Sequence, residues 1–325
     1  MRQNIGRSCA PSRMALAPVS FKEHINTQGR LPRLMVEEGQ PPAEAMKRGR
    51  GGRRAVFGLV VAIVAFLAGL GTGFVFFSPK PPAKLIVGTN TPFPPFEFRN
   101  ATTDTIEGFG IDLITAVLDR MGYQRTNDPA TTEWELFDFR DFSALLAAVG
   151  TGRVDIAESS ITMNGDIGAK RNETMDFTNV YFESDQGVLQ RASDATNYCA
   201  DDNNCLASEF NKATLKVAVQ GGTSSEFWVD DNLKAVQLQT FPDVTQVLQA
   251  LQTQAVDIVV IDRPAAAGIV VGNPQFAVGG TIQTNELYAF AVENKDPLGL
   301  VPKMNSALAS IKSDGTYDTL INKWF

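Results

Sequence analysis

The chain has little of the chemistry that metal and redox sites need. Its 325 residues include one His and three Cys. Structural zinc sites and iron–sulfur clusters each use several Cys or His ligands, so we expect no cofactor and no bound metal. The single His24 lies in an Arg-rich stretch, which is an unfavourable place for a catalytic triad.

Basic residues are scarce after residue 54. Residues 1–54 contain eleven Lys and Arg against four Asp and Glu, whereas residues 55–325 contain 18 basic and 32 acidic residues. The formal net charge of -7 therefore combines a basic N-terminal segment with an acidic remainder. Nucleic-acid phosphates attract Lys and Arg, so this balance argues against nucleic acid as the partner.

An apolar run separates these two parts. Residues 55–77 contain no charged side chain, and 23 such residues can cross a bilayer as a helix. The cluster of Lys and Arg at 47–54 predicts that residues 1–54 form a basic cytoplasmic tail, which is disordered because it is rich in Pro, Gly, Arg and Ser. We interpret 55–77 as a transmembrane signal anchor, with a cleavable signal peptide as the alternative. Whether the chain starts at Met1 or at Met46 stays open.

The part after residue 83 repeats one unit. Residues 143–157 and 244–259 each read as an amphipathic helix, a turn and an apolar strand, with Val-Asp-Ile triplets 102 residues apart. Apolar strands at 85–88 and 215–219 precede the two units. The order of strand, helix and strand indicates α/β layers, and the repeat predicts two α/β lobes of similar plan. A chance likeness between two ordinary helix–strand units is the alternative.

Two of the three cysteines lie close together in this part. Cys199 and Cys205 are flanked by Asp and Asn, with no His nearby. Outside the cytoplasm, such a pair in a polar loop favours a local disulfide over a metal site.

Hydroxyl groups and an Arg follow the strand of the first unit. Ser159, Ser160 and Thr162 stand where the strand ends, and Arg171 comes nine residues later. Hydroxyls at a strand end can bind an anion, and a guanidinium can hold a carboxylate with two hydrogen bonds. An ordinary turn and a solvated Arg are the competing interpretation.

A carboxylate holds the matching place in the second unit. Asp262 lies 102 residues after Ser160, at the end of an apolar strand. It could accept an ammonium group, or it could cap the helix that begins near Pro264. If the two strand ends face each other, they form a cleft with a polar group from each lobe.

Two aromatic residues and a glycine-rich turn complete the candidates. Phe93 lies in a Pro-rich turn and Phe142 precedes a helix, places typical of pocket walls, although core packing is the commoner use of Phe. The turn Gln220 to Ser224 can offer N–H groups to a polar ligand. The sequence lacks the Gly-x-Gly-x-x-Gly and Gly-Lys-Ser/Thr patterns, so a nucleotide is a poor fit.

In order and spacing, these residues resemble the polar amino-acid-binding proteins of bacterial ABC importers, the extracytoplasmic solute-binding protein family 3. The resemblance covers roughly residues 84–325. The matching motifs are VGTN at 87–90, FPPFEF at 93–98, GFGIDL at 108–113, DFSAL at 141–145, GRVDI at 152–156, SSIT at 159–162, MDFT at 175–178, YFES at 181–184, DGT at 314–316 and KWF at 323–325.

The resemblance implies an α/β, two-lobed periplasmic-binding-protein fold of type II. Each lobe would be a mixed sheet flanked by helices, with the ligand cleft between the lobes. Lobe 1 would comprise 84–188 plus 282–325, lobe 2 would comprise 189–281, and two crossing strands would form the hinge. The implied function is a non-enzymatic, monomeric extracytoplasmic receptor that closes around an amino acid and delivers it to an ABC permease.

The resemblance also implies how the backbone of the amino acid is held. Arg171 would bind the α-carboxylate, helped by Ser160, Thr162 and the turn at Ser224. Asp262 would bind the α-ammonium group.

Five more residues would contact the side chain of the amino acid. Phe93 and Phe142 would stack on its two sides. Asn90, Ser159 and Gln220 would set its specificity.

Three features depart from the family pattern. About four extra residues, 165–168, lie between Thr162 and Arg171. Asn90 stands where several relatives have Asp, which leaves polar uncharged ligands open. Glu158 occupies a strand position that is usually apolar, and the sequence offers no reason for it.

Two alternative functions remain. The family resembles cyclohexadienyl dehydratases, whose chemistry needs a general acid in the cleft, and Glu158 would be the candidate. A ligand sensor that acts on a separate signalling partner is the other.

Overall fold

The structure, a computed structural model, describes residues 84–325. These residues belong to one compact unit. The cytoplasmic tail predicted at 1–54 and the membrane anchor predicted at 55–77 lie outside the described residues. Within 84–325, no helix combines the length and the apolar character that crossing a membrane requires.

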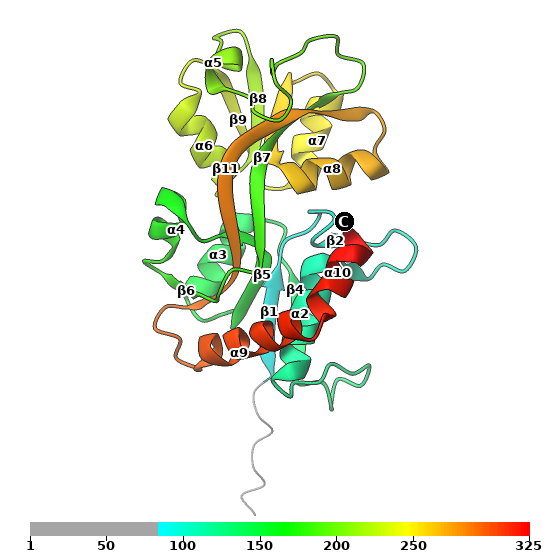
Figure 1. The fold of residues 1–325 in the computed structure, drawn as a ribbon, viewed down its shortest axis with the longest axis vertical. Helices are drawn as coiled ribbons and strands as arrows, with labels where there is room; N and C mark the ends of the chain where they lie inside the picture. Colours follow the sequence, from blue (N-terminus) through cyan, green and yellow to red (C-terminus); the bar gives the residue numbers. More distant parts are fainter. Residues whose placement is uncertain (1–83) are drawn as a thin grey trace, which may run out of the picture. The chain divides into compact units, whose positions relative to one another are not determined.

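A nine-stranded mixed sheet organises the fold (Figure 1). The short strand β6 pairs with β11 at the side of the main path, and two further strands form a separate ribbon. In sheet order the main strands are β4 (Trp134–Asp138), β1 (Leu85–Thr89), β5 (Ile156–Thr162), β11 (Phe276–Glu293), β7 (Phe182–Arg191), β10 (Ile258–Asp262), β8 (Lys216–Gln220) and β9 (Gln237–Phe241). The others are β6 (Met175–Phe177), β2 (Phe98–Arg99) and β3 (Ile106–Glu107).

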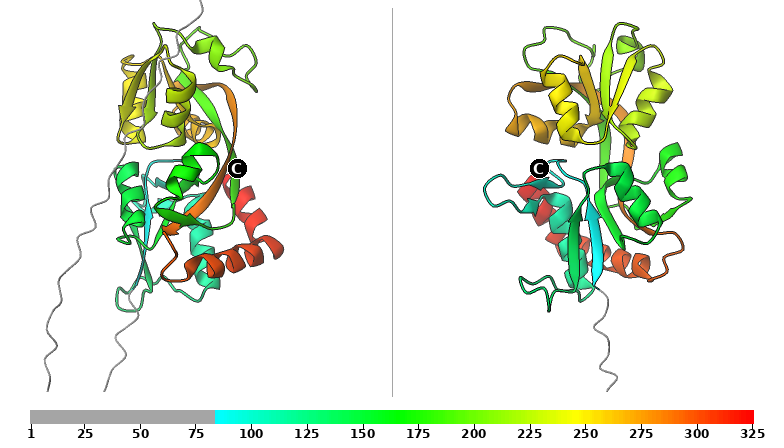
Figure 2. Two further views of the ribbon diagram at one scale, coloured as in Figure 1. Left: turned by 90° about the vertical axis from the view of Figure 1, so that its left-hand side faces the viewer. Right: turned by 180° about the vertical axis from the view of Figure 1, so that it is seen from behind.

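Helices flank the sheet in both halves of the molecule, as the views in Figure 2 show. We call the half that contains β4, β1 and β5 lobe 1, and the half that contains β10, β8 and β9 lobe 2. The helices are α2 (Phe109–Arg120), α3 (Phe142–Gly150), α4 (Gly165–Arg171), α5 (Ala207–Phe210), α6 (Ser224–Asn232), α7 (Val244–Gln252), α8 (Arg263–Gly272), α9 (Leu300–Ser313) and α10 (Thr316–Trp324).

The repeat in the sequence corresponds to a structural repeat. Helices α3 and α7 begin 102 residues apart, and strands β5 and β10 that follow them also begin 102 residues apart. In lobe 1, β1 pairs in parallel with both β4 and β5, and in lobe 2, β8 pairs in parallel with both β9 and β10. The Asp of each Val-Asp-Ile triplet accepts a backbone N–H: Asp155 from Ile86 at 2.7 Å and Asp257 from Lys216 at 2.8 Å. Equivalent sequences therefore make equivalent local structure.

Two long strands join the lobes. The antiparallel pair β7 and β11 runs from one half of Figure 1 into the other. In lobe 1, β11 pairs antiparallel with β5, and in lobe 2, β7 pairs antiparallel with β10. Each lobe thus has a mixed sheet, so the predicted two-lobed α/β fold is confirmed. Where along the crossing strands each lobe ends stays a prediction.

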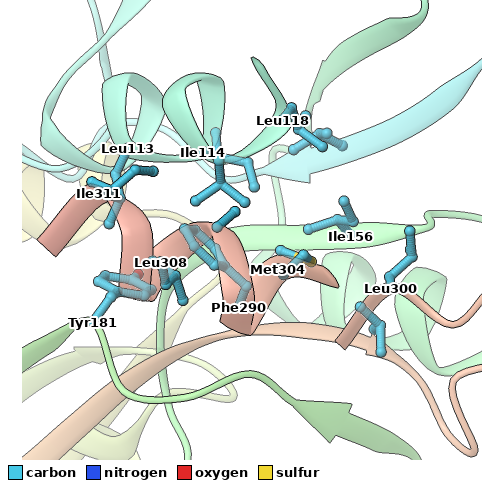
Figure 3. Packing of buried hydrophobic residues seen from close by; sticks show 14 of the residues in the cluster. Leu113, Ile114, Leu118, Ile156, Tyr181, Phe290, Leu300, Met304, Leu308 and Ile311 are labelled. Atoms are coloured by element: carbon cyan, nitrogen blue, oxygen red, sulfur yellow. The ribbon is translucent and has the colours of Figure 1, made fainter. Parts of the chain in front are cut away.

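The largest apolar core lies in lobe 1 between the sheet and helices α2 and α9 (Figure 3). On α2, Leu113, Ile114 and Leu118 recur at helical spacing and are fully buried. They pack with Phe290 of β11 and Met304 of α9. Because β11 supplies part of this core while it also enters lobe 2, packing in lobe 1 fixes one end of the connection between the lobes.

The predicted disulfide is present in lobe 2. Cys199 and Cys205 are bonded to each other and buried, and they pack in an apolar cluster beside β8 and β10.

Candidate ligand-binding site

All ten residues singled out from the sequence line one cavity between the lobes. Strand ends supply most of them, because parallel strands in each lobe point their carboxyl ends toward the other lobe. The ten are Asn90, Phe93, Phe142, Ser159, Ser160, Thr162, Arg171, Gln220, Ser224 and Asp262. Eight further residues complete the lining: Glu97, Thr223, Ser225, Val244, Val247, Val259, Val260 and Ile261.

Hydrogen bonds join the two lobes directly across this cavity. Each bond joins a residue of lobe 1 directly to a residue of lobe 2, so the lobes are closed on each other. The three bonds run from Gln220 Nε2 to Asn90 Oδ1 at 2.8 Å, from Arg171 Nη2 to the Gly222 carbonyl at 3.0 Å, and from Thr162 Oγ1 to Ser224 Oγ at 3.3 Å.

Arg171 is the cation of the site. It is the last residue of helix α4 and is buried, and its Nη1 group donates to the carbonyl of Thr162 at 2.8 Å. Its Nε has no hydrogen-bond partner among residues 84–325. Burial lowers the pKa of Arg171 to about 10, so the guanidinium stays charged at neutral pH. A buried cation with an unused donor is suited to an anionic group of a ligand.

The four extra residues before Arg171 form part of a helix. Residues 165–168 are the first four positions of α4, and Arg171 is its last. A Cβ at Gly168 would collide with the backbone of Met163, so a glycine is needed for the helix to pack here. The extra residues thus position Arg171 on a short helix instead of removing it from the cavity.

Asp262 is the carboxylate of the site. It ends β10 in lobe 2, and it accepts hydrogen bonds from the hydroxyl of Tyr288 at 2.5 Å and from Nε2 of Gln186. Burial, followed by the nearby carboxylate of Glu286, raises the pKa of Asp262 to about 8. Asp262 makes no side-chain cap for α8, so the capping alternative does not hold.

The raised pKa of Asp262 predicts a pH dependence of binding. An ammonium group needs the ionised carboxylate, so a ligand that carries one must displace a proton from Asp262 below pH 8. Affinity should therefore fall by up to about tenfold for each pH unit below 8, the slope for one released proton. Calorimetry in buffers of different ionisation enthalpy would count that proton, and Asp262→Asn should remove its release. Equal affinity at pH 6 and pH 8 would contradict the expectation.

A second buried carboxylate, Glu286, was missed from the sequence. It lies on β11 next to an irregularity in the pairing with β7, and it accepts from Thr162 at 2.6 Å, from Ser224 at 2.7 Å and from Gln186 at 2.7 Å. Thr162 belongs to lobe 1 and Ser224 to lobe 2, so Glu286 connects both lobes to the crossing strand. Nothing local distinguishes it from a surface Glu, because its partners lie up to 124 residues away.

Ser160 holds an unusual backbone conformation. Its φ of 48° lies in the left-handed region, which costs a non-glycine residue about 1–3 kcal/mol. The surrounding strand β5 is buried along its whole length and enforces this conformation. Such strain is typical of positions where a backbone must present its groups to a ligand.

The two predicted aromatic walls differ in their surroundings. Phe142 is buried, and the guanidinium of Arg171 lies 5.5 Å from its ring centre. Phe93 is partly exposed and packs against the apolar clusters of both lobes. Phe142 therefore lines the cavity beside the guanidinium of Arg171, whereas Phe93 contacts the apolar residues of both lobes.

Comparison with known proteins places the chain. The family model for bacterial extracellular solute-binding proteins, family 3, matches residues 85–325. The L-cystine-binding protein TcyJ of Escherichia coli (strain K12) is 27% identical over 289 residues, covering 86% of this chain and 98% of TcyJ. The ABC transporter glutamine-binding protein GlnH of Bacillus subtilis is 24% identical over 244 residues, covering 74% and 81%.

The fold of a solved relative agrees. An ancestral arginine-binding protein bound to arginine superimposes with a TM-score of 0.63 and is 30% identical, covering 75% of this chain and 98% of that one. The chain belongs to the family of bacterial extracellular solute-binding proteins, family 3.

Proposed function

We propose that the protein is an extracytoplasmic receptor that binds an amino acid between its lobes and delivers it to the permease of an ABC transporter. One observation carries the proposal. Arg171 from lobe 1 and Asp262 from lobe 2 are both buried and line the same cavity. A zwitterion needs one fixed cation and one fixed anion, and it contacts both only when the lobes are closed.

The remaining contacts to the amino acid backbone follow from this pair. Arg171 binds the α-carboxylate together with Thr162 and with the first N–H groups of α6 at Ser224, since a helix N-terminus favours an anion. Asp262 and the hydroxyl of Ser160 bind the α-ammonium group.

The rest of the cavity favours a polar, uncharged side chain. Phe93 and Phe142 flank it. Gln220 donates to Asn90 and to the carbonyl of Pro242, and Asn90 donates to the carbonyl of Phe139. One N–H of Asn90 and the amide oxygen of Gln220 are left for a ligand that both donates and accepts. Ser159 adds a hydroxyl. The relative GlnH is named for glutamine, an amino acid with a side chain of this uncharged kind.

The wider organisation is proposed on sequence grounds. The receptor acts as a monomer, and the apolar stretch 55–77 holds it at the outer face of the membrane beside its permease. Lobe 1 takes 84–188 plus 282–325 and lobe 2 takes 189–281, so that β7 and β11 form the hinge.

A thermal-shift screen against the common amino acids tests the function. A ligand that binds the folded state at 100 times its Kd stabilises that state by about 2.7 kcal/mol, which appears as a rise in melting temperature. We expect one or a few uncharged polar amino acids to raise the melting temperature of residues 84–325. No shift with any amino acid at millimolar concentration would rule the proposal out.

The dehydratase alternative has less support. Its candidate acid, Glu158, is fully buried and is not among the described residues that line the cavity. Its carboxyl accepts a hydrogen bond from the hydroxyl of Thr89. Formation of product from arogenate or prephenate, lost on Glu158→Gln, would restore this alternative.

A further inference from the structure

Two buried carboxyl groups, one in the wall of the cavity and one behind that wall, have no part in the proposed function. Glu97 follows the Pro-rich turn after β1, and Glu158 lies on β5; neither is exposed to solvent. Glu97 lines the cavity, whereas Glu158 lies behind it. The only sequence hint was that Glu158 occupies a position suited to an apolar residue.

The two carboxyl groups lie against the same residue, Gly110 of α2. Two buried carboxyl groups this close, with no cation between them, cannot both ionise, so one of them keeps a proton. One oxygen of Glu158, Oε1, has no hydrogen-bond partner among residues 84–325, and its second oxygen accepts from Thr89 at 3.3 Å.

The surroundings of the pair supply no compensating cation. None of the ion pairs within residues 84–325 involves Glu97 or Glu158. Helix α2 approaches the pair at Gly110, where a Cβ would collide with Glu158 and lie 3.3 Å from Glu97. The titratable group facing the pair is Tyr181, whose own pKa is raised well above its usual value by burial and by these carboxyls. Two negative charges would be unstable here.

Glu97, the carboxyl group that faces the cavity, also accepts hydrogen bonds from two hydroxyl groups. Ser159 donates to Glu97 at 3.3 Å and Ser160 donates to it at 3.4 Å. These two donors would stabilise an ionised Glu97 if Glu158 were absent, because hydrogen bonds to a carboxylate lower its pKa. Burial and the charge of Glu158 act in the opposite direction and raise the pKa of Glu97 well above its usual value.

We propose that Glu158 determines the specificity of the site by keeping a proton on Glu97, so that the cavity wall carries no negative charge and a cationic side chain is rejected. This inference rests on the proposed amino-acid-binding function and deepens it. A lysine or arginine side chain would need an ionised partner when buried, and the remaining charged residues of the lining, Arg171 and Asp262, are taken by the backbone of the ligand.

Arginine and citrulline measure this discrimination, because they have nearly the same shape and differ by one charge. We expect the wild type to bind citrulline more tightly than arginine at pH 7. In Glu158→Gln the new amide donates to Glu97, which then ionises with three donors. The citrulline preference should shrink by about tenfold or more, since one pKa unit corresponds to a tenfold factor.

Two further variants separate the retained proton from a packing role. Glu97→Gln should keep the preference for citrulline, because an amide at this position leaves the cavity wall as uncharged as a protonated Glu97 does. Glu135→Gln, at an exposed carboxylate paired with Lys84, is the matched control and should change nothing.

A measurement without ligand keeps this inference distinct from the receptor function. Carboxyl ¹³C chemical shifts of the free protein should show a protonated Glu97 at pH 7 in the wild type and an ionised one in Glu158→Gln. An ionised Glu97 in the wild type, or the same citrulline-to-arginine ratio in Glu158→Gln, would overturn the inference. A protonated Glu97 combined with no binding of any amino acid would support the retained proton and count against the receptor function alone.

Discussion

Arg171→Ala should abolish amino-acid binding while the protein stays folded, and Asp262→Ala should do the same. Each substitution removes one partner of a buried, charge-assisted contact, which typically costs about 3–5 kcal/mol. Since about 1.4 kcal/mol corresponds to a factor of ten, we expect a loss of affinity of 100-fold or more. Isothermal titration calorimetry with the amino acid found in the thermal-shift screen measures it.

Two controls make this result specific to the site. Arg120→Ala removes a half-exposed Arg that pairs with Asp314, so it should leave affinity unchanged. Arg171→Lys keeps the charge but loses the planar fork, so it should bind more weakly than the wild type and more tightly than Arg171→Ala. Near-wild-type affinity in both Arg171→Ala and Asp262→Ala, with unaltered circular dichroism, would mean that the zwitterion is not held here.

Gly268→Ala should weaken binding strongly although Gly268 is not part of the cavity lining. Gly268 lies on α8 in lobe 2, and a Cβ there would come within 2.5 Å of the carbonyl oxygen of Pro94 in the turn before Glu97, on the lobe 1 side. The methyl group would hold the closed lobes apart and leave each lobe intact. Overpacking costs about 1–3 kcal/mol, so affinity should fall by roughly five- to 150-fold.

The same helix provides the matched control. Gly272 ends α8, and a Cβ there would meet nothing within 4 Å. Gly272→Ala should therefore bind the amino acid as the wild type does. Small-angle scattering with saturating ligand should show a more open Gly268→Ala protein. Equal affinity for the two variants would indicate that closure does not depend on the contact between α8 and the turn at Pro94.

The repeat was the most reliable guide to the fold. The Val-Asp-Ile triplets at 154–156 and 256–258 are local signals: an apolar strand after a helix and a turn, with an Asp that accepts a neighbouring backbone N–H. Local patterns of this kind specify local structure, and two copies of one pattern specify two similar lobes. Most of the ten candidate residues stand at strand ends or turns of the two lobes, and the resemblance to the family implied their roles.

The carboxyl groups around the site were beyond the reach of the sequence. Glu286 contacts Thr162 and Ser224, its sequence neighbours reveal nothing of this, and the contact exists because β11 crosses between the lobes beside β5. Likewise, Glu158 looked anomalous because its partner Glu97 lies 61 residues earlier in the chain. Which side chains meet across elements depends on strand register and on how closely helices approach.

By itself, the sequence determined the two similar lobes, the disulfide and the candidate residues that the structure brings to one cavity. These follow from local periodicity, turn chemistry and motif order. Only the tertiary structure decided the close approach of Gly268 to Pro94, the contacts of Glu286 with both lobes and the burial of Glu97 and Glu158 beside each other. Those features need atoms from distant segments within a few ångströms of each other, and no local pattern encodes that proximity.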